Sequence, residues 1–126
     1  MSATIGERVV HRRYVPHGHA HYGGGLVDGA YVLGLFGDAA TELCIRTDGD
    51  EGLFAGYDRV EFRAPVRAGD VIEVTATIDR VGRRSRGVEF TAVVSTRADP
   101  ERGPSAAHVC APALVVVVAH GTVVVP

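Results

Sequence analysis

The sequence predicts an α+β fold in which an antiparallel β-sheet wraps around one long central α-helix, as a single domain over residues 1–126. Only the segment from Leu26 to Ile45 carries apolar residues at the spacing of one helical face. The segments that follow alternate apolar and polar residues with the period of a strand. Because a single helix cannot cover both faces of a sheet, we expect antiparallel strands that curve around it.

Composition narrows the classes of function. A chain of 126 residues with 46% hydrophobic residues can build one core. The net charge of −2 argues against nucleic-acid binding. All 13 basic residues are arginines, which excludes Schiff-base chemistry on lysine. Cys44 and Cys110 lie far apart in apolar settings and are expected to be free thiols. With no signal peptide and no membrane span in the pattern, we expect a soluble cytoplasmic protein.

The start of the predicted helix is the first candidate site. Three glycines, Gly23, Gly24 and Gly25, stand just before the apolar run, and the helix is expected from Gly24 or Leu26 to Ile45. The first N–H groups of a helix lack internal partners and carry partial positive charge, and glycine lets a ligand approach them. Asp28 falls in the first two turns, where it either complements the helix dipole or acts as a general acid–base group.

The remaining pattern predicts five strands joined by turns rich in Gly, Asp and Pro. These strands are expected over residues 5–15, 53–66, 71–81, 88–97 and 108–125. The polar stretches 47–52, 68–70 and 82–87 are read as turns, and 16–20 and 98–107 as loops. Gly121 inside the last strand suggests a bulge or bend.

Histidines and a tyrosine precede the glycines. His17, His19 and His21 would share one side of an extended segment, but no Cys or carboxylate stands close by in sequence, so no metal site is expected there. His21 is either an acid–base residue or a structural cap. Tyr22 either donates its hydroxyl to a substrate or packs on the first helical turn. The other histidines are expected to be packed or surface residues: His11, His108 and His120.

Arg83, Arg84 and Arg86 form the second candidate site, in the turn between two strands. They are either a solvated hairpin tip or a clamp for phosphate, since arginine pairs bidentately with phosphate. Asp48, Asp50 and Glu51 resemble part of a calcium loop, but the helix–loop–helix frame is missing and a turn is expected.

Several sequence blocks together closely resemble the 3-aminobutyryl-CoA ammonia-lyase family, a branch of the hotdog-fold superfamily. The resemblance covers nearly the whole chain from His21 onward. The blocks are His21-Tyr22-Gly23-Gly24, Leu26-Val27-Asp28-Gly29-Ala30, Leu35-Phe36-Gly37-Asp38, Ala40-Thr41-Glu42-Leu43, Asp48-Gly49-Asp50-Glu51-Gly52-Leu53-Phe54, Tyr57-Asp58, Val60-Glu61-Phe62, Ala64-Pro65-Val66, Ala68-Gly69-Asp70 and Gly121-Thr122-Val123-Val124-Val125-Pro126.

The resemblance implies a hotdog fold and reversible loss of ammonia from 3-aminobutyryl-CoA, or a similar 3-aminoacyl-CoA, to give crotonyl-CoA, as in anaerobic lysine degradation. It implies a homodimer or higher homo-oligomer with the active site at the subunit interface. Beyond the CoA of the substrate, no cofactor and no metal are expected.

The roles that go with this activity fall on the candidates above. Asp28 is the expected base, the amides of Gly23, Gly24 and Gly25 the donors to the thioester enolate, and His21 or Tyr22 the group that positions or protonates the amine. Asp58 or Glu51 from a partner subunit is expected to hold the substrate ammonium. Substrate contacts are further expected from Tyr57, and CoA-phosphate contacts from Arg83, Arg84 and Arg86.

Three alternatives remain open on sequence grounds: an acyl-CoA thioesterase, an enoyl-CoA hydratase and a non-catalytic acyl-CoA-binding module. In the common thioesterase branch of this superfamily, the helix carboxylate lies about two turns past the glycine pair. The corresponding position here is near Tyr31, which cannot serve as a carboxylate, and this favours the lyase.

Overall fold

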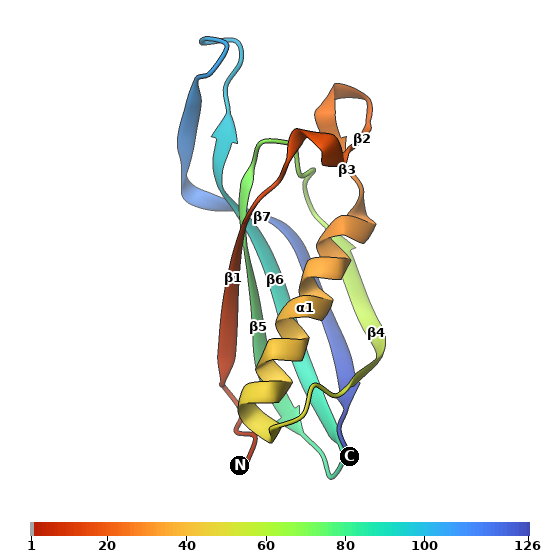
Figure 1. The fold of residues 1–126 in the computed structure, drawn as a ribbon. Coiled ribbons are helices and arrows are strands. Elements are labelled where there is room, and N and C mark those ends of the chain that lie inside the picture. The colour runs from red at the N-terminus through yellow and green to blue at the C-terminus, as the bar shows by residue number, and fades with distance from the viewer. Residues whose placement is uncertain (1) are drawn as a thin grey trace.

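The computed structural model describes residues 2–126 and places one long helix against a five-stranded antiparallel sheet (Figure 1). Along the chain the elements are β1 (Arg8–Tyr14), η1 (His17–His19), β2 (Ala20–Tyr22), η2 (Gly23–Gly25), β3 (Leu26–Val27), α1 (Gly29–Asp48), β4 (Leu53–Phe62), β5 (Val71–Val81), β6 (Ser85–Ala98) and β7 (Ala107–Val124). The strand order is β1-β5-β6-β7-β4, and β2 pairs with β3 in a separate small sheet. The predicted hotdog architecture is confirmed.

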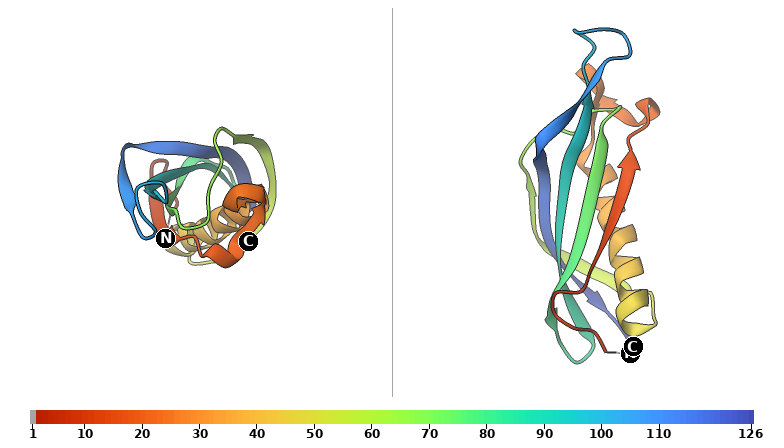
Figure 2. Two further views of the ribbon diagram at one scale, coloured as in Figure 1. Left: turned by 90° about the horizontal axis from the view of Figure 1, so that it is seen from above. Right: turned by 90° about the vertical axis from the view of Figure 1, so that its left-hand side faces the viewer.

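The sheet curves around α1, and the core lies between them. Viewed along the helix, the strands enclose α1 on one side (Figure 2). In β5 the buried residues alternate with more exposed ones, so one face of the strand packs toward the helix. Phe36 of α1 stacks on Phe90 of β6 with ring centroids 4.9 Å apart, and both side chains are fully buried. This pair supplies aromatic packing at the centre of a core otherwise made mainly of Val, Ala, Leu and Ile.

The helix begins later than the sequence predicts. Gly24 and Gly25 have φ values of +75° and +74°, which a right-handed helix does not allow, so η2 is a separate turn. Leu26 and Val27 then pair with β2, and α1 starts only at Gly29. The helix also ends later, at Asp48. Gly49 adopts the left-handed conformation there and donates its N–H to the carbonyl of Ile45.

Strand β5 spans the predicted residues 71–81, and the other strands differ at their ends. Strand β6 starts at Ser85, which shortens the predicted connection, and β6 and β7 continue into a long hairpin arm beyond the body of the sheet (Figure 2). The predicted bulge at Gly121 lies instead in the neighbouring strand. Tyr57 pairs with Gly121 and Arg59 with His120, so Asp58 of β4 is the extra residue.

Cys44 and Cys110 are free thiols, as predicted. Among the residues that the structure describes, no helix is long and apolar enough to cross a membrane.

Candidate active site

A cavity of about 420 Å³ lies beside the first turn of α1. Its walls come from β2, β3, the start of α1, the end of β4 and the segment after it, and β7. The lining residues are Tyr22, Leu26, Val27, Asp28, Gly29, Val32, Phe62, Arg63, Ala64, Pro65, Val66 and Val117. The size and the mixture of apolar walls with a few polar groups are those of a small-molecule site.

Asp28 stands at this cavity as the N-cap residue of α1. Its backbone is extended, with φ −72° and ψ 154°, and its side chain forms no capping hydrogen bond. An aspartate at this position ordinarily accepts a hydrogen bond from an N–H group of the first turn. Because Asp28 does not, its carboxylate is available to a ligand in the cavity.

The helix amides next to Asp28 are also available. Gly29 and Ala30 are the first two residues of α1, so their N–H groups have no acceptor four residues back inside the helix. The N–H of Tyr31 already lies 3.3 Å from the carbonyl oxygen of Asp28. Gly29 lines the cavity, so the positive end of the helix dipole faces the cavity there.

This placement corrects the prediction that Gly23, Gly24 and Gly25 form the start of the helix. They form η2, ahead of β3, and the carbonyl of Gly25 accepts a hydrogen bond from the N–H of Ala68 at 2.8 Å. Gly24 and Gly25 line a different cleft, which also contains Arg67 and the loop at residues 98–107. The three glycines shape the approach to α1 but do not supply its N-terminal amides.

Phe62, the last residue of β4, packs directly against Gly29. A Cβ atom on Gly29 would lie only 2.5 Å from Cε1 of Phe62, so glycine is required for this contact. Phe62 also lines the cavity, and its side chain is 57% exposed in the single chain. The helix start and the end of β4 thus define the mouth of the cavity together.

Tyr22 lines the cavity, whereas His21 does not. The His21 ring meets the Tyr22 ring edge-on at a centroid distance of 4.7 Å, so His21 contacts the tyrosine that lines the cavity. The other two histidines of this segment diverge: His19 lies against Tyr31 and His17 near Tyr14. The three side chains do not converge on one point.

Tyr57 and Asp58 of β4 have partners outside the cavity. The Tyr57 hydroxyl donates to the carbonyl of Leu33 in α1 at 3.1 Å, and burial raises the pKa of this phenol. The carboxylate of Asp58 lies 2.6 Å from Nδ1 of His120, a hydrogen bond that lowers the pKa of Asp58. Within one chain, the Tyr57 hydroxyl thus ties β4 to α1, and its predicted substrate contact stays a prediction.

The three arginines of the second candidate site separate. Arg86 turns into the protein, 8% exposed, and its guanidinium binds the carboxylate of Asp48 at 2.6 Å. Arg83 and Arg84 remain exposed in the turn between β5 and β6. Arg84 lines a cleft with Glu51 near the C-terminal end of α1, and this cleft is separate from the cavity at Asp28. The predicted phosphate clamp of three arginines is thus reduced to two residues.

Several residues of the cavity were not identified from the sequence. Phe62 is the last residue of β4, Arg63 and Val66 follow it, and Val117 comes from β7. Only Arg63 carries a charge, and it lay in a segment predicted as strand. Pro65 is the signal that could have found this wall, because proline lacks an N–H group and interrupts strand pairing.

Comparisons with known proteins assign the family. A family model described as "Thioesterase superfamily" matches residues 24–100. The chain is 57% identical over 109 residues to the 3-aminobutyryl-CoA ammonia lyase of Acetoanaerobium sticklandii, with 85% of each chain covered. Among solved structures, the β-alanyl-CoA:ammonia lyase from Clostridium propionicum superposes with a TM-score of 0.91 at 35% identity, covering 97% of this chain and 87% of that one.

A hexameric hotdog-fold thioesterase of Campylobacter jejuni shares the fold, with a TM-score of 0.72 at 21% identity over 91% of this chain and 80% of that one. The much higher identity to the two ammonia lyases separates this chain from such thioesterases. The chain therefore belongs to the 3-aminobutyryl-CoA ammonia-lyase family, a branch of the thioesterase superfamily.

Proposed function

We propose that this protein is a carbon–nitrogen lyase that reversibly eliminates ammonia from 3-aminobutyryl-CoA, or a close 3-aminoacyl-CoA, to give crotonyl-CoA. The family assignment supports the reaction class. The observation that carries the mechanism is the uncapped carboxylate of Asp28, which lines a cavity beside the free amides of Gly29 and Ala30.

The first step is removal of the proton alpha to the thioester carbonyl. The Asp28 carboxylate takes this proton, and the electron pair of the C–H bond moves onto the thioester as an enolate. The N–H groups of Gly29 and Ala30 stabilise the oxygen as it gains negative charge, with the helix dipole acting in the same direction. The apolar walls, including Val32 and Phe62, keep water from the reacting atoms.

The second step is departure of ammonia. The enolate electrons form the new carbon–carbon double bond, and the C–N bond breaks with its electron pair going to nitrogen. Because the amino group is bound as an ammonium, it leaves as neutral ammonia without receiving a further proton. The Tyr22 hydroxyl, at the rim of the cavity, positions this nitrogen, and His21 contacts the ring of Tyr22 edge-on.

A homo-oligomer completes the site. Tyr22 and Phe62 border the cavity and are each 57% exposed in the single chain, so a second copy would cover them. The turn between β5 and β6, which carries Arg83 and Arg84, lies at the end of the molecule opposite the start of α1 (Figure 1). These arginines reach CoA phosphates, and Glu51 or Asp58 reaches the substrate ammonium, only from that second copy. A cytoplasmic location and a place in lysine degradation belong to the same proposal.

The decisive experiment compares Asp28→Asn with Asp38→Asn, an exposed residue of the same helix. Crotonyl-CoA and ammonium are supplied, and loss of the enoyl-thioester absorbance is followed. We expect Asp28→Asn to lower the rate by about 10²–10⁴-fold, the typical contribution of a general base, while the CoA ester still binds. Asp38→Asn should retain the wild-type rate. An unchanged rate in Asp28→Asn would remove Asp28 from the proposed role.

The same assay separates the alternatives, which share the fold. A thioesterase would release free CoA thiol from crotonyl-CoA, and a hydratase would consume the enoyl group without ammonium. A binding module would do neither, although it would still bind the ester. Strict dependence on ammonium with no release of thiol is the result expected for the lyase.

A further inference from the structure

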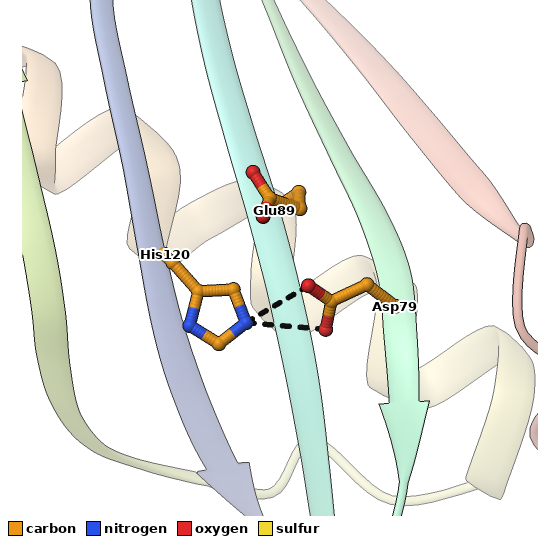
Figure 3. A group of neighbouring side chains, drawn as sticks. All are labelled: Asp79, Glu89 and His120. Carbon is orange, nitrogen blue, oxygen red and sulfur yellow. Dashed lines mark hydrogen bonds and ion pairs between the residues drawn. The ribbon is translucent and has the colours of Figure 1, made fainter.

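Three side chains from neighbouring strands meet on the outer face of the sheet (Figure 3). Asp79 of β5, Glu89 of β6 and His120 of β7 each offer one ligand atom, and these atoms lie within 4.8 Å of one another. Their chain neighbours Ile78 and Val88 are fully buried against the helix side, so by strand alternation this group points the opposite way. The group is thus separate from the cavity at Asp28.

The imidazole of His120 lies between two carboxylates. Its Nδ1 is 2.6 Å from Oδ1 of Asp58, and its Nε2 is 3.1 Å and 2.9 Å from Oδ1 and Oδ2 of Asp79. A neutral imidazole carries one N–H and can donate to only one of these acceptors. When Nδ1–H donates to Asp58, the lone pair of Nε2 faces the Asp79 oxygens. A second proton on Nε2, as in the imidazolium form, or a metal ion between Nε2 and Asp79 makes that contact favourable.

We propose that Asp79, Glu89 and His120 bind a divalent first-row transition-metal ion, with Zn²⁺ the best match, and that Asp58 positions His120 for it. One imidazole nitrogen and two carboxylate oxygens, with a remaining position for water, are a donor set that zinc accepts. With metal–ligand bonds of about 2.0–2.2 Å, tetrahedral ligand atoms stand roughly 3.3–3.6 Å apart. The separation of Nε2 and Asp79 is already close to this value.

Asp58 accepts the hydrogen bond from the ring nitrogen of His120 that would not bind the metal. Imidazoles that bind metals usually donate their other N–H to a carboxylate, which fixes the tautomer and the ring orientation. Asp58 occupies this place because of the bulge in β4. Tyr57 pairs with Gly121 and Arg59 with His120, and Asp58 is the extra residue between these two pairs. A regular strand without this bulge would aim the side chain of residue 58 differently, and the bond from Nδ1 of His120 depends on the bulge.

Charge in the group also favours a cation. Three carboxylates surround His120, from Asp58, Asp79 and Glu89, and one guanidinium offsets them: Nη2 of Arg59 lies 3.2 Å from Oε2 of Glu89. Arg59 also contacts Glu61, at 3.6 Å, so its charge is shared. A bound divalent ion neutralises the excess negative charge and joins β5, β6 and β7 through side chains. The expectation that His120 is merely a packed or surface residue would then be incomplete.

The test uses tag-free protein treated with a chelator, dialysed and titrated with Zn²⁺ in a calorimeter. We expect one Zn²⁺ per chain. His120→Gln should weaken binding by at least about 100-fold because it removes a direct ligand, and Asp58→Asn by about 10-fold or more, as for other second partners of ligating histidines. His108→Gln is the matched control, since His108 is an exposed histidine 3.7 Å from Asp99, and it should bind as tightly as the wild type.

Two further measurements keep the result interpretable. Co²⁺ should give visible d–d absorption in the wild type and in His108→Gln but not in His120→Gln. Circular dichroism establishes that each variant is folded, and Glu89→Gln replaces His120→Gln if that variant does not fold. The proposal is overturned if the wild type binds no Zn²⁺, or if His120→Gln and Glu89→Gln both bind it as tightly as His108→Gln. In that case a proton, not a metal, lies between His120 and Asp79.

Discussion

The guanidinium of Arg86 binds the carboxylate of Asp48 through two hydrogen bonds, Nε to Oδ2 at 3.1 Å and Nη2 to Oδ1 at 2.6 Å. This ion pair connects the last residue of α1 to the start of β6, with side-chain exposures of 9% for Arg86 and 11% for Asp48. Arg86 also donates to the carbonyls of Gly82 and Ser85, so it holds the β5–β6 turn at the same time.

Breaking this pair should therefore weaken the fold and change its response to acid. The hydrogen bond to Arg86 lowers the pKa of Asp48 from its usual 3.8. A lowered folded-state pKa contributes stability above the ordinary value, and that contribution is lost as the pH falls from about 4 toward the folded-state pKa. We expect Asp48→Asn to lower the free energy of unfolding by about 3–5 kcal/mol at neutral pH, because Arg86 is left buried without its partner.

Urea unfolding at several pH values measures the effect. The gap between wild type and Asp48→Asn should narrow as the pH falls below 4, since the wild type loses the same interaction by protonation. The exposed Asp38→Asn serves as the control and should stay within about 0.5 kcal/mol of the wild type. A gap that is independent of pH would show that the carboxylate charge of Asp48 is not what stabilises the pair.

The hydroxyl of Tyr57 should matter for stability and little for catalysis. Tyr57→Phe removes the 3.1 Å bond to the carbonyl of Leu33 while keeping the ring between Phe54 and Phe90, so unfolding should become easier by about 0.5–1.5 kcal/mol. The exposed Tyr14→Phe is the comparison for stability. Ammonia addition to crotonyl-CoA by Tyr57→Phe should remain close to the wild-type rate, and a hundredfold loss would instead place this hydroxyl in the chemistry.

The contact between Gly29 and Phe62 should be tested by adding a single methyl group. In Gly29→Ala the new Cβ collides with the ring of Phe62, which is partly exposed and can move outward, so the cavity mouth changes more than the fold does. We expect a raised KM for the CoA ester. Gly34→Ala is the matched control, because it lies in the same helix with nothing within 4 Å of the new Cβ. That variant should gain up to about 1 kcal/mol of stability and keep normal kinetics.

The two thiols should react at very different rates. Burial raises the pKa of Cys44 to about 11, and the residue is fully buried, so little thiolate forms at neutral pH and reagents cannot reach it. Cys110 is only partly buried. An aromatic disulfide reagent should therefore modify one thiol per native chain and two per denatured chain. In native Cys110→Ser the reagent should modify no thiol. Modification of this variant would mean that Cys44 becomes accessible by local opening.

The fold could be predicted from the sequence because strong periodic signals encode it. The alternation in residues 71–81 gave β5 correctly, and the helical spacing after Leu26 gave α1. The predicted start of α1 was wrong because the apolar pair Leu26–Val27 fits both a helix and a strand. The positive φ angles of Gly24 and Gly25, which decide between them, are not visible in composition.

Side-chain partners were harder to predict, because they depend on which face of a strand is buried. Arg86 lies on the same face of β6 as Val88 and Phe90, which are both fully buried, so strand register turns it inward while Arg83 and Arg84 stay in solvent. Knowing that β6 begins at Ser85 would have separated these arginines. The wall formed by Phe62 and Val117 depends on strand pairing across the chain, for which local sequence carries no direct signal.

The uncapped start of α1 has a consequence for stability. A helix whose N-cap side chain leaves the first-turn amides alone is about 1 kcal/mol weaker than one that is properly capped. Aspartate caps helices about as well as serine or asparagine, so the missing bond follows from where the Asp28 carboxylate points and not from the residue type. In the mechanism proposed above, stability at the helix start is given up so that this carboxylate stays free for the substrate.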